Sequence, residues 1–290
     1  MTNSNMMPNR IQIIIVLYKT TLQESISYQS FKKYCASLTV PYTLLIYNNS
    51  PEVTIPLSTE YTLINATSNR YLQGAYSEAL QLAQQNKADW LLLLDQDTAL
   101  TAEYFTSISN FLYQDNATDY CAAVPNLCQE SIHLSPCCYP KWVGPFWQSY
   151  LKPYTNKVAA ERKSEIYMAF NSATLLSVSA ICQVGGFDEQ YPLDMLDYRY
   201  FYQLHLQGGK MYVLDTVLQQ KLSLLSIEDS MSIERYKSYL SSCLRFAKQL
   251  SVRCVLLYKL RLCRTIAAQL LKKSKRKFLK YSIVHLFAWK

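Results

Sequence analysis

The sequence is poor in the features that mark several protein classes. Its 290 residues include only 6 glycines and 10 prolines, which excludes a collagen-like or linker-like chain. Charged residues make up 17% against 50% hydrophobic ones, so a mainly disordered chain is excluded too. Charges interrupt every apolar run before the roughly 18 residues that a membrane span needs. No signal-peptide pattern follows Met1, so we do not expect export by that route.

Common catalytic and metal-binding motifs are also missing. The chain has no G-x-S-x-G, Walker A or GxGxxG pattern, which removes support for a serine hydrolase, a P-loop enzyme or a dinucleotide-binding protein. His133, His205 and His285 lie too far apart in sequence for metal-ligand spacing. The 9 cysteines are odd in number and form no CxxC, so we interpret them as reduced, mostly buried thiols of a cytoplasmic protein.

Positive charge is concentrated at the C-terminal end. The net charge is +8, but residues 232–290 hold 15 Lys and Arg against one acid, Glu234, a net of +14. The first 231 residues therefore carry 8 − 14 = −6. A tail this basic suits an anionic surface, either phospholipid or nucleic acid. We favour this over a solvated helical face because six basic residues are unusually dense: Lys272, Lys273, Lys275, Arg276, Lys277 and Lys280.

The hydrophobic pattern predicts an α/β fold. Apolar runs predict strands over 11–17, 42–46, 61–64, 90–94, 173–178 and 210–214, and helical spacing predicts helices over 22–38, 71–85 and 194–207. This alternation favours βαβ units and a parallel sheet. Residues 115–165 are less regular, and the pattern from Ile233 onward is helical and basic. We expect a catalytic domain over 1–220 and a helical segment over 221–290.

Asp95-Gln96-Asp97 is the first candidate site. It follows the apolar run WLLLL directly, and ligands of open α/β sheets bind beyond the carboxyl ends of the strands. Two carboxylates there suit Mg²⁺ or Mn²⁺, which can bridge a diphosphate. The alternative is a loop in which one aspartate caps the next helix.

Asp194 and Asp197 form the second candidate site. At i and i+3 they share one face at the start of the expected helix. Either carboxylate could act as a general base on a hydroxyl, or both could only favour the helix N-terminus. A third, weaker signal is Asn69 with Gly74 at the head of the 71–85 helix, where a phosphate could approach the backbone. Helix packing explains that pattern equally well.

These constellations, in this order, resemble family 2 glycosyltransferases of the GT-A fold. The similarity is greatest to bacterial rhamnosyltransferase-like enzymes of surface-polysaccharide synthesis, and it covers about residues 10–250. The matching pieces include IIIVLYKT, LLIYNNSPE, NRYLQGAYSEALQLA, DWLLLLDQDT and GGFDEQYPLDMLDYRYFYQLHLQGGKMYVL. The resemblance implies a GT-A domain with a mostly parallel central sheet, followed by basic C-terminal helices.

The resemblance also implies roles for individual residues. Asp95 and Asp97 would bind Mn²⁺ or Mg²⁺, with Asp97 the more direct ligand, and Asp194 or Asp197 would be the catalytic base of an inverting displacement. The residues expected around the nucleotide sugar are Tyr18, Asn48, Asn49, Asn69, Gly74, Asp95, Gln96, Ala173 and Thr174. The expected partners are a nucleotide-sugar donor, a glycan or lipid-linked acceptor, and an anionic membrane surface.

Four positions depart from the family pattern. Tyr47 replaces an aspartate that contacts the base, and Tyr71 replaces a glycine. Gln203 stands for a common arginine, and Gln220 for a histidine that can assist the metal. We therefore expect an enzyme on the inner face of the cytoplasmic membrane, with two alternatives. One is a non-catalytic relative that binds a nucleotide sugar, and the other is a nucleic-acid-binding protein that uses the basic tail.

Overall fold

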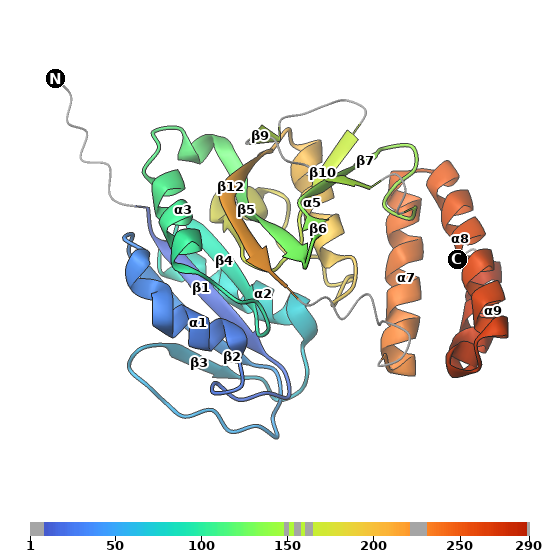
Figure 1. The fold of residues 1–290 in the computed structure, drawn as a ribbon, viewed down its shortest axis with the longest axis horizontal. Coiled ribbons are helices and arrows are strands. Elements are labelled where there is room, and N and C mark those ends of the chain that lie inside the picture. The colour runs from blue at the N-terminus through green and yellow to red at the C-terminus, as the bar shows by residue number, and fades with distance from the viewer. Residues whose placement is uncertain (1–8, 148–150, 154–157, 160–164, 221–230, 289–290) are drawn as a thin grey trace.

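A nine-stranded sheet forms the centre of the molecule (Figure 1). The computed structural model describes residues 9–147, 151–153, 158–159, 165–220 and 231–288. The strand order is β3-β2-β1-β4-β11-β5-β12-β9, with β6 beside β5. The strands of this sheet are β1 (Ile11–Leu17), β2 (Tyr42–Asn48), β3 (Thr62–Asn65), β4 (Trp90–Asp95), β5 (Tyr120–Gln129), β6 (Ile132–Ser135), β9 (Val158–Ala159), β11 (Thr174–Ser177) and β12 (Lys210–Gln219).

The sheet is mostly parallel, as expected. Strands β3, β2, β1, β4, β5 and β12 point the same way, and β11 runs antiparallel between β4 and β5. Leu17 pairs with Asn48 and Val16 with Asp95, so β1, β2 and β4 end at one edge. The chain order reverses between β1 and β4, and ligands of open α/β sheets bind at such a switch point.

Helices cover both faces of the sheet (Figure 1). Leu91 and Leu93 pack with Tyr76 in one core cluster, while Leu92 and Leu94 pack with Phe105 in the other. Side chains alternate between the two faces of a strand, so the fully apolar β4 is buried on both sides. The helices of this part are α1 (Ile26–Tyr34), α2 (Tyr71–Gln85), α3 (Ala102–Leu112), α4 (Val178–Gln183) and α5 (Leu196–Leu206), with short 3₁₀ turns η1 (Cys35–Ser37) and η2 (Ala117–Asp119).

The segment 115–165 is more regular than the sequence indicates. It contains β5, a ten-residue central strand, although Pro125 cannot donate to a β-ladder. The neighbouring β12 shifts register between Val213 and Val217, opposite this proline. Asn126 Nδ2 fills the gap by donating to the carbonyls of Leu214 and Thr216, both at 3.3 Å. A separate small sheet holds β7 (Cys137–Pro140), β8 (Lys152–Pro153) and β10 (Glu165–Met168).

The C-terminal part is helical from Ile233, as predicted. It contains α7 (Ile233–Leu250), α8 (Val252–Leu271), η5 (Lys273–Phe278) and α9 (Leu279–Phe287), which stand beside the sheet in Figure 1. Phe246 of α7 packs edge-on against Tyr198 and Tyr202 of α5, so the helices join the core of the preceding part. The expected domain boundary falls at residues 220 and 221, and residues 221–230 lie outside the described ones.

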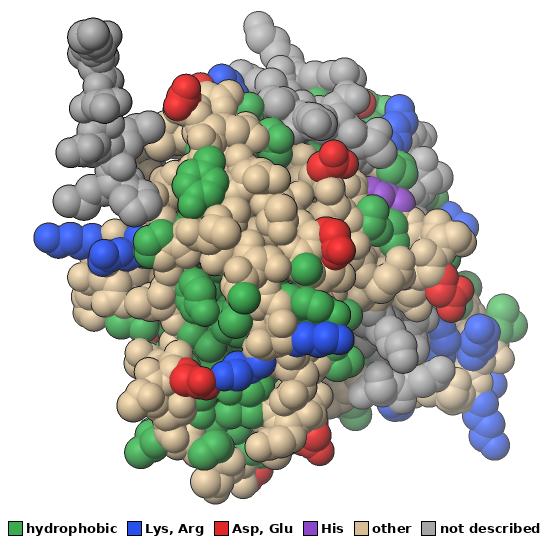
Figure 2. Space-filling view, turned by 60° about the vertical axis from the view of Figure 1, so that its left-hand side comes forward, with side chains coloured by type: hydrophobic (Ala, Val, Ile, Leu, Met, Phe, Trp, Pro, Cys, Tyr) green, Lys and Arg blue, Asp and Glu red, His purple; other side chains and the backbone are tan. Residues whose placement is uncertain are grey.

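No helix of the described residues is long and apolar enough to cross a bilayer. All 9 cysteines are free thiols, and five of them are buried, as expected for most of these thiols. On the face shown in Figure 2, acidic side chains are spread singly over the surface, while Lys and Arg side chains gather toward the lower right edge.

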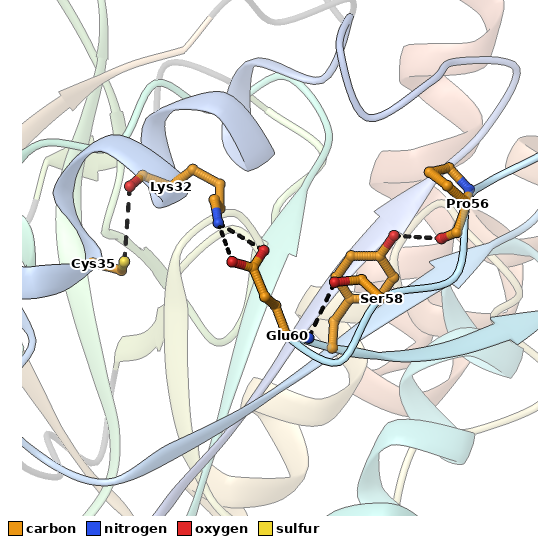
Figure 3. Close-up of polar contacts among 6 residues, drawn as sticks. Lys32, Cys35, Pro56, Ser58 and Glu60 are labelled. Atoms are coloured by element: carbon orange, nitrogen blue, oxygen red, sulfur yellow. Dashed lines mark hydrogen bonds and ion pairs between the residues drawn. The ribbon is translucent and has the colours of Figure 1, made fainter.

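The long connection after β2 is fastened to α1. Lys32 Nζ lies 2.7 Å from both carboxylate oxygens of Glu60 (Figure 3). Ser58 Oγ accepts from the Glu60 amide at 3.1 Å, and the Tyr61 hydroxyl donates to the Pro56 carbonyl. These contacts hold the last part of the loop between β2 and β3 against α1, near the end of the sheet where β2 and β3 begin.

Candidate active site

Side chains from two segments distant in sequence donate hydrogen bonds to the carboxylate of Asp95. Its Oδ1 accepts a hydrogen bond from the Tyr76 hydroxyl of α2 at 3.0 Å, and its Oδ2 accepts one from Ser172 Oγ at 2.5 Å. Ser172 Oγ in turn accepts from Gln220 Nε2, just after β12, at 2.5 Å. Sequence reasoning identified Asp95 but not Tyr76 or Ser172. The carboxylate is thus fixed in orientation by a chain of hydrogen bonds.

The two acids after β4 differ in their surroundings. Burial raises the pKa of Asp95, and the hydrogen bonds from Ser172 and Tyr76 act in the opposite direction. Loss of hydration and the nearby Asp95 charge raise the pKa of Asp97 to about 6. More than a third of Asp97 stays open to solvent, so water screens part of this effect. Asp97 is therefore the more exposed of the two acids, and the charge of the more buried Asp95 acts on it.

Asp197 lies in the first turn of α5. The preceding Met195 has a left-handed backbone with φ 67°, and the helix begins at Leu196. The Asp197 carboxylate accepts from the Tyr198 amide at 2.9 Å. Burial first, and then the charges of Asp194 and Asp95, raise the pKa of Asp197 to about 7. Such a group exchanges a proton near neutral pH, which is the property of a general base.

Asp194 does not share the helix face with Asp197, which corrects the sequence interpretation. It precedes α5, and its Oδ1 lies 3.2 Å from Arg235 Nη2 of α7. Only 8% of the Asp194 side chain is exposed. Burial raises the pKa of Asp194, while the Arg235 guanidinium opposes that rise. Of the two predicted bases, Asp194 is therefore the one that pairs with a guanidinium, whereas the Asp197 carboxylate accepts from a backbone amide.

The buried asparagines after β2 use their side chains inside the protein. Asn48 Nδ2 donates to the Val53 carbonyl at 2.7 Å and to Asn65 Oδ1 at 3.0 Å. Asn49 Nδ2 donates to the Tyr71 carbonyl at 3.1 Å, and its Oδ1 accepts from the Arg70 amide at 2.6 Å. Both residues shape the loops at the sheet edge. Their predicted contact with a nucleotide remains a prediction.

Other predicted contact residues are also anchored within the fold. Gln96 Oε1 accepts from the Tyr18 amide at 2.7 Å, which joins the ends of β1 and β4. Thr174 is fully buried, and its hydroxyl donates to the Phe170 carbonyl at 2.6 Å. Of these three, only the Tyr18 side chain is prominent at the surface, 42% exposed.

The head of α2 is built from Asn69, Tyr71 and Gly74. Asn69 Oδ1 accepts from the Tyr71 amide at 2.8 Å. A Cβ on Gly74 would lie 2.6 Å from the Arg70 Cβ, so close packing of Arg70 requires this glycine. The alternative that the sequence left open, helix packing, thus explains Gly74 without a ligand.

Backbone strain gathers around the same edge. Six non-glycine residues of the described chain have positive φ, and four of them border the site: Lys19 (52°), Tyr71 (55°), Ala173 (57°) and Met195 (67°). A left-handed conformation is unfavourable for residues with a side chain, and such strain clusters at functional sites. The positive φ at position 71 therefore explains why the family pattern has a glycine where this chain has Tyr71.

Tyr47, which stands where the family pattern has an aspartate, makes a polar contact with α2. The Tyr47 hydroxyl donates to Glu78 Oε1 of α2 at 3.2 Å, and Arg70 Nη1 lies 3.6 Å from the same oxygen. Gln203 lies elsewhere, lining a surface cavity of about 520 Å³ between α2, the 184–189 loop and α5. Gln220, by contrast, reaches Asp95 through Ser172.

The carboxylates of Asp95 and Asp97 fit a divalent cation whose other ligands come from substrate phosphates and water. No group of three or more His, Cys, Asp or Glu within the described ranges could hold a metal ion alone. Mg²⁺ is commonly held by one or two carboxylates, with substrate phosphates and water completing its shell. The open carboxylate of Asp97 with Asp95 beside it matches that pattern.

Comparison with known proteins identifies the fold. No protein-family model and no curated protein sequence matches the chain. The structure of GalNAc-T7 with UDP, GalNAc and Mn²⁺ matches with a TM-score of 0.53 at 13% identity, over 82% of this chain and 48% of that one. The chain has the GT-A fold. It spans about half the length of GalNAc-T7.

Two further GT-A structures match over more of their length. Residues 1–349 of S. aureus TarS match with a TM-score of 0.49 at 12% identity, over 95% of this chain and 87% of that one. The mannosyltransferase PcManGT from Pyrobaculum calidifontis, in complex with GDP-Man and Mn²⁺, matches with a TM-score of 0.48 at 12% identity, over 95% of this chain and 84% of that one. The predicted GT-A fold class is confirmed by the GalNAc-T7 match and by the observed sheet order.

Proposed function

We propose that the protein is a glycosyltransferase that moves a sugar from a nucleotide-diphosphate donor to a hydroxyl of a glycan or lipid-linked acceptor. The observation that carries this proposal is the meeting of Asp95, Asp97 and Asp197 at the switch point of a GT-A sheet. The charge of Asp95 acts on both other carboxylates, so the three lie in one electrostatic neighbourhood. The GT-A structure of GalNAc-T7 holds UDP, GalNAc and Mn²⁺.

Asp97 and Asp95 would hold Mn²⁺ or Mg²⁺ at this site. The cation would neutralise the negative charge that develops on the diphosphate leaving group. Tyr76 and Ser172 keep the Asp95 carboxylate in one orientation, and a ligand held in this way loses little freedom when a cation binds. Ser172 in turn is positioned by Gln220.

Asp197 is the proposed base. It takes the proton of the acceptor hydroxyl while the acceptor oxygen bonds to the anomeric carbon. The bond from that carbon to the diphosphate oxygen breaks, and its electron pair leaves with the nucleotide diphosphate. A single displacement of this kind inverts the anomeric configuration. Asp194 is less suited because its carboxylate is paired with Arg235.

The finer assignment follows the sequence resemblance. We place the protein in family 2, near the rhamnosyltransferase-like enzymes of surface-polysaccharide synthesis. Residues 1–220 would form the catalytic domain, and the basic helices after residue 220 would hold it on the inner face of the cytoplasmic membrane. The order of the motifs and the net charge of +14 over residues 232–290 support this assignment.

Turnover of a nucleotide sugar tests the proposal. The purified chain is incubated with a panel of nucleotide sugars, glycan and lipid-linked acceptors, and Mn²⁺ or Mg²⁺, and release of nucleotide diphosphate is measured. We expect turnover with one donor and strong loss in Asp197→Asn. Asp115→Asn, at an exposed position after α3, is the matched control. Donor binding without turnover on any acceptor would instead favour the non-catalytic alternative.

A further inference from the structure

An apolar stripe runs along the outer side of α8. Val252, Leu256 and Leu260 are 76%, 56% and 53% exposed, which is unusual for large aliphatic side chains that follow one another on a helix. The exposed members recur every three or four residues and so share one face of the helix. The stripe consists of Val252, Leu256, Leu260, Cys263, Ala267, Leu270 and Leu271.

The opposite face of α8 packs against the rest of the protein. Cys254, Tyr258 and Leu262 are buried, and the Tyr258 hydroxyl donates to the Leu240 carbonyl of α7. Gln269 is fully buried and donates to the Tyr236 hydroxyl at 2.9 Å. The helix is therefore held firmly by one side. Its apolar stripe lies on the side that these contacts leave open.

The neighbouring α9 adds a second apolar edge. It lies beside α8 in Figure 1, and the two helices share a core cluster around Leu262 and Phe278. Val284 and Phe287 of α9 are 64% and 73% exposed. Both α8 and α9 thus carry exposed apolar side chains.

The charged residues of α8 and of the chain that follows it are all basic. Helix α8 carries Arg253, Lys259, Arg261 and Arg264 and has no acid. The basic run of residues 272–280 follows directly, and Glu234 is the one acid from residue 232 to the end. The exposed guanidinium of Arg253 lies 4.4 Å above the Trp142 ring, and that of Arg264 lies 5.1 Å above the Trp147 ring.

We propose that the apolar stripe of α8, together with the exposed edge of α9, is the face by which this protein docks on an anionic phospholipid surface. The stripe would enter the boundary between headgroups and acyl chains, and the basic side chains would lie among the phosphates. This deepens the membrane association that forms part of the proposed function. It assigns the apolar contact to α8 rather than to the basic run alone.

A second copy of the chain is the competing occupant of the stripe. Two α8 helices packed stripe to stripe would bring their basic residues together without an acid on either helix to pair with them. Like charges at close range destabilise such a contact. An anionic lipid surface supplies the missing negative charge, so charge complementarity favours the lipid.

Vesicle co-sedimentation with the full chain tests the proposal. Vesicles of phosphatidylcholine alone are compared with vesicles in which part of the lipid is phosphatidylglycerol. The double variant Leu256→Gln/Leu260→Gln is compared with Leu57→Gln, a loop residue that is 86% exposed. We expect binding only to the anionic vesicles, weakened about tenfold or more in the double variant. Leu57→Gln should bind like the wild type, and thermal unfolding should show that all variants are folded.

Three results would overturn the proposal. They are no binding to anionic vesicles, equal binding by the double variant, and a dimer in sedimentation analysis that the double variant abolishes. The readout is independent of catalysis. Vesicle binding without turnover would support the docking face and contradict the proposed glycosyltransferase activity. Turnover without vesicle binding would support that activity and contradict the docking face.

Discussion

The guanidinium of Arg235, in the first turn of α7, forms an ion pair with the carboxylate of Asp194 at 3.2 Å. This contact joins the C-terminal helices to the loop that leads into Asp197. Asp194 is almost enclosed, with 8% of its side chain exposed, whereas Arg235 retains 36%. The pair therefore fixes the loop while leaving one edge of the guanidinium in water.

Arg235→Gln should destabilise the protein by about 2 kcal/mol at pH 8. Removing one partner of a buried ion pair leaves an uncompensated charge, and the partial exposure of Arg235 reduces that cost. At pH 5 the loss should be smaller, because Asp194, whose pKa burial raises, can then take up a proton. Urea unfolding at the two pH values measures both effects. The double variant Arg235→Gln/Asp194→Asn should regain most of the stability, and equal losses for single and double variants would contradict the pairing.

Asp197 should make the free protein less stable as pH rises from about 4 to 7. The pKa of its buried carboxyl is raised from 3.8 to about 7, so within this window the folded state binds more protons than the unfolded state. The stabilisation is complete below the lower pKa and is lost as pH rises through the folded one. Asp197→Asn should remove this slope and be more stable above pH 7 by roughly 2–4 kcal/mol.

Thermal and urea unfolding from pH 4 to 8, without metal or nucleotide, checks this expectation. Asp97 has a raised pKa as well, so the relevant quantity is the difference between wild type and Asp197→Asn. Parallel pH profiles for the two proteins would show that Asp197 titrates normally. The case for Asp197 as a base poised near neutral pH would then fail.

Ser172→Ala should weaken metal binding at the Asp95–Asp97 pair. The hydroxyl of Ser172 donates to Asp95 at 2.5 Å, and this hydrogen bond lowers the pKa of that carboxyl. Its loss should raise the Asp95 pKa further and free the side chain to turn. We expect affinity for Mn²⁺ in the presence of nucleotide to fall about tenfold. Ser172→Thr should retain most of the affinity, Ser58→Ala serves as the control, and unchanged Mn²⁺ titrations in Ser172→Ala would rule out this supporting role.

Tyr71→Gly should stabilise the protein by about 0.5–1 kcal/mol. Tyr71 has φ 55°, a conformation that costs a residue with a side chain about 1–2 kcal/mol but that glycine adopts freely. Tyr71→Val should be destabilising at the same position, because β-branched residues tolerate this region least. Denaturant midpoints give the ranking. If Tyr71→Gly is less stable than the wild type, packing of the aromatic ring outweighs the backbone strain.

The first part of the fold could be predicted because its strands are buried on both faces. The run IQIIIVL predicts β1 with the observed bounds, and the helix over 71–85 coincides with α2. Strand β5 escaped prediction because Pro125 and Asn126 interrupt its apolar pattern, and a register shift of β12 accommodates them. Helix α3 was not expected, although Thr101 caps its start and Phe105, Ile108 and Leu112 follow at helical spacing.

The site could be predicted only in part. Asp95 and Asp97 stand out because two charges follow a buried strand directly, a pattern that sequence shows. Tyr76 and Ser172 reach Asp95 from distant segments, and a hydroxyl that donates to a carboxylate leaves no trace in local sequence. Asn48 suggested a ligand contact because it ends a strand, yet it is fully buried and bonded to its own loop.

Binding of a nucleotide sugar tests the central claim most directly. Thermal unfolding is followed with a panel of nucleotide sugars, with and without Mn²⁺ or Mg²⁺, on the wild type, Asp97→Ala and the exposed control Asp115→Ala. A ligand at a hundred times its Kd adds about 2.7 kcal/mol to the free energy of unfolding. We expect one donor to raise Tm only with metal, in the wild type and Asp115→Ala but not in Asp97→Ala. No shift with any donor, or an equal shift in Asp97→Ala, would contradict a nucleotide-sugar site at Asp95 and Asp97.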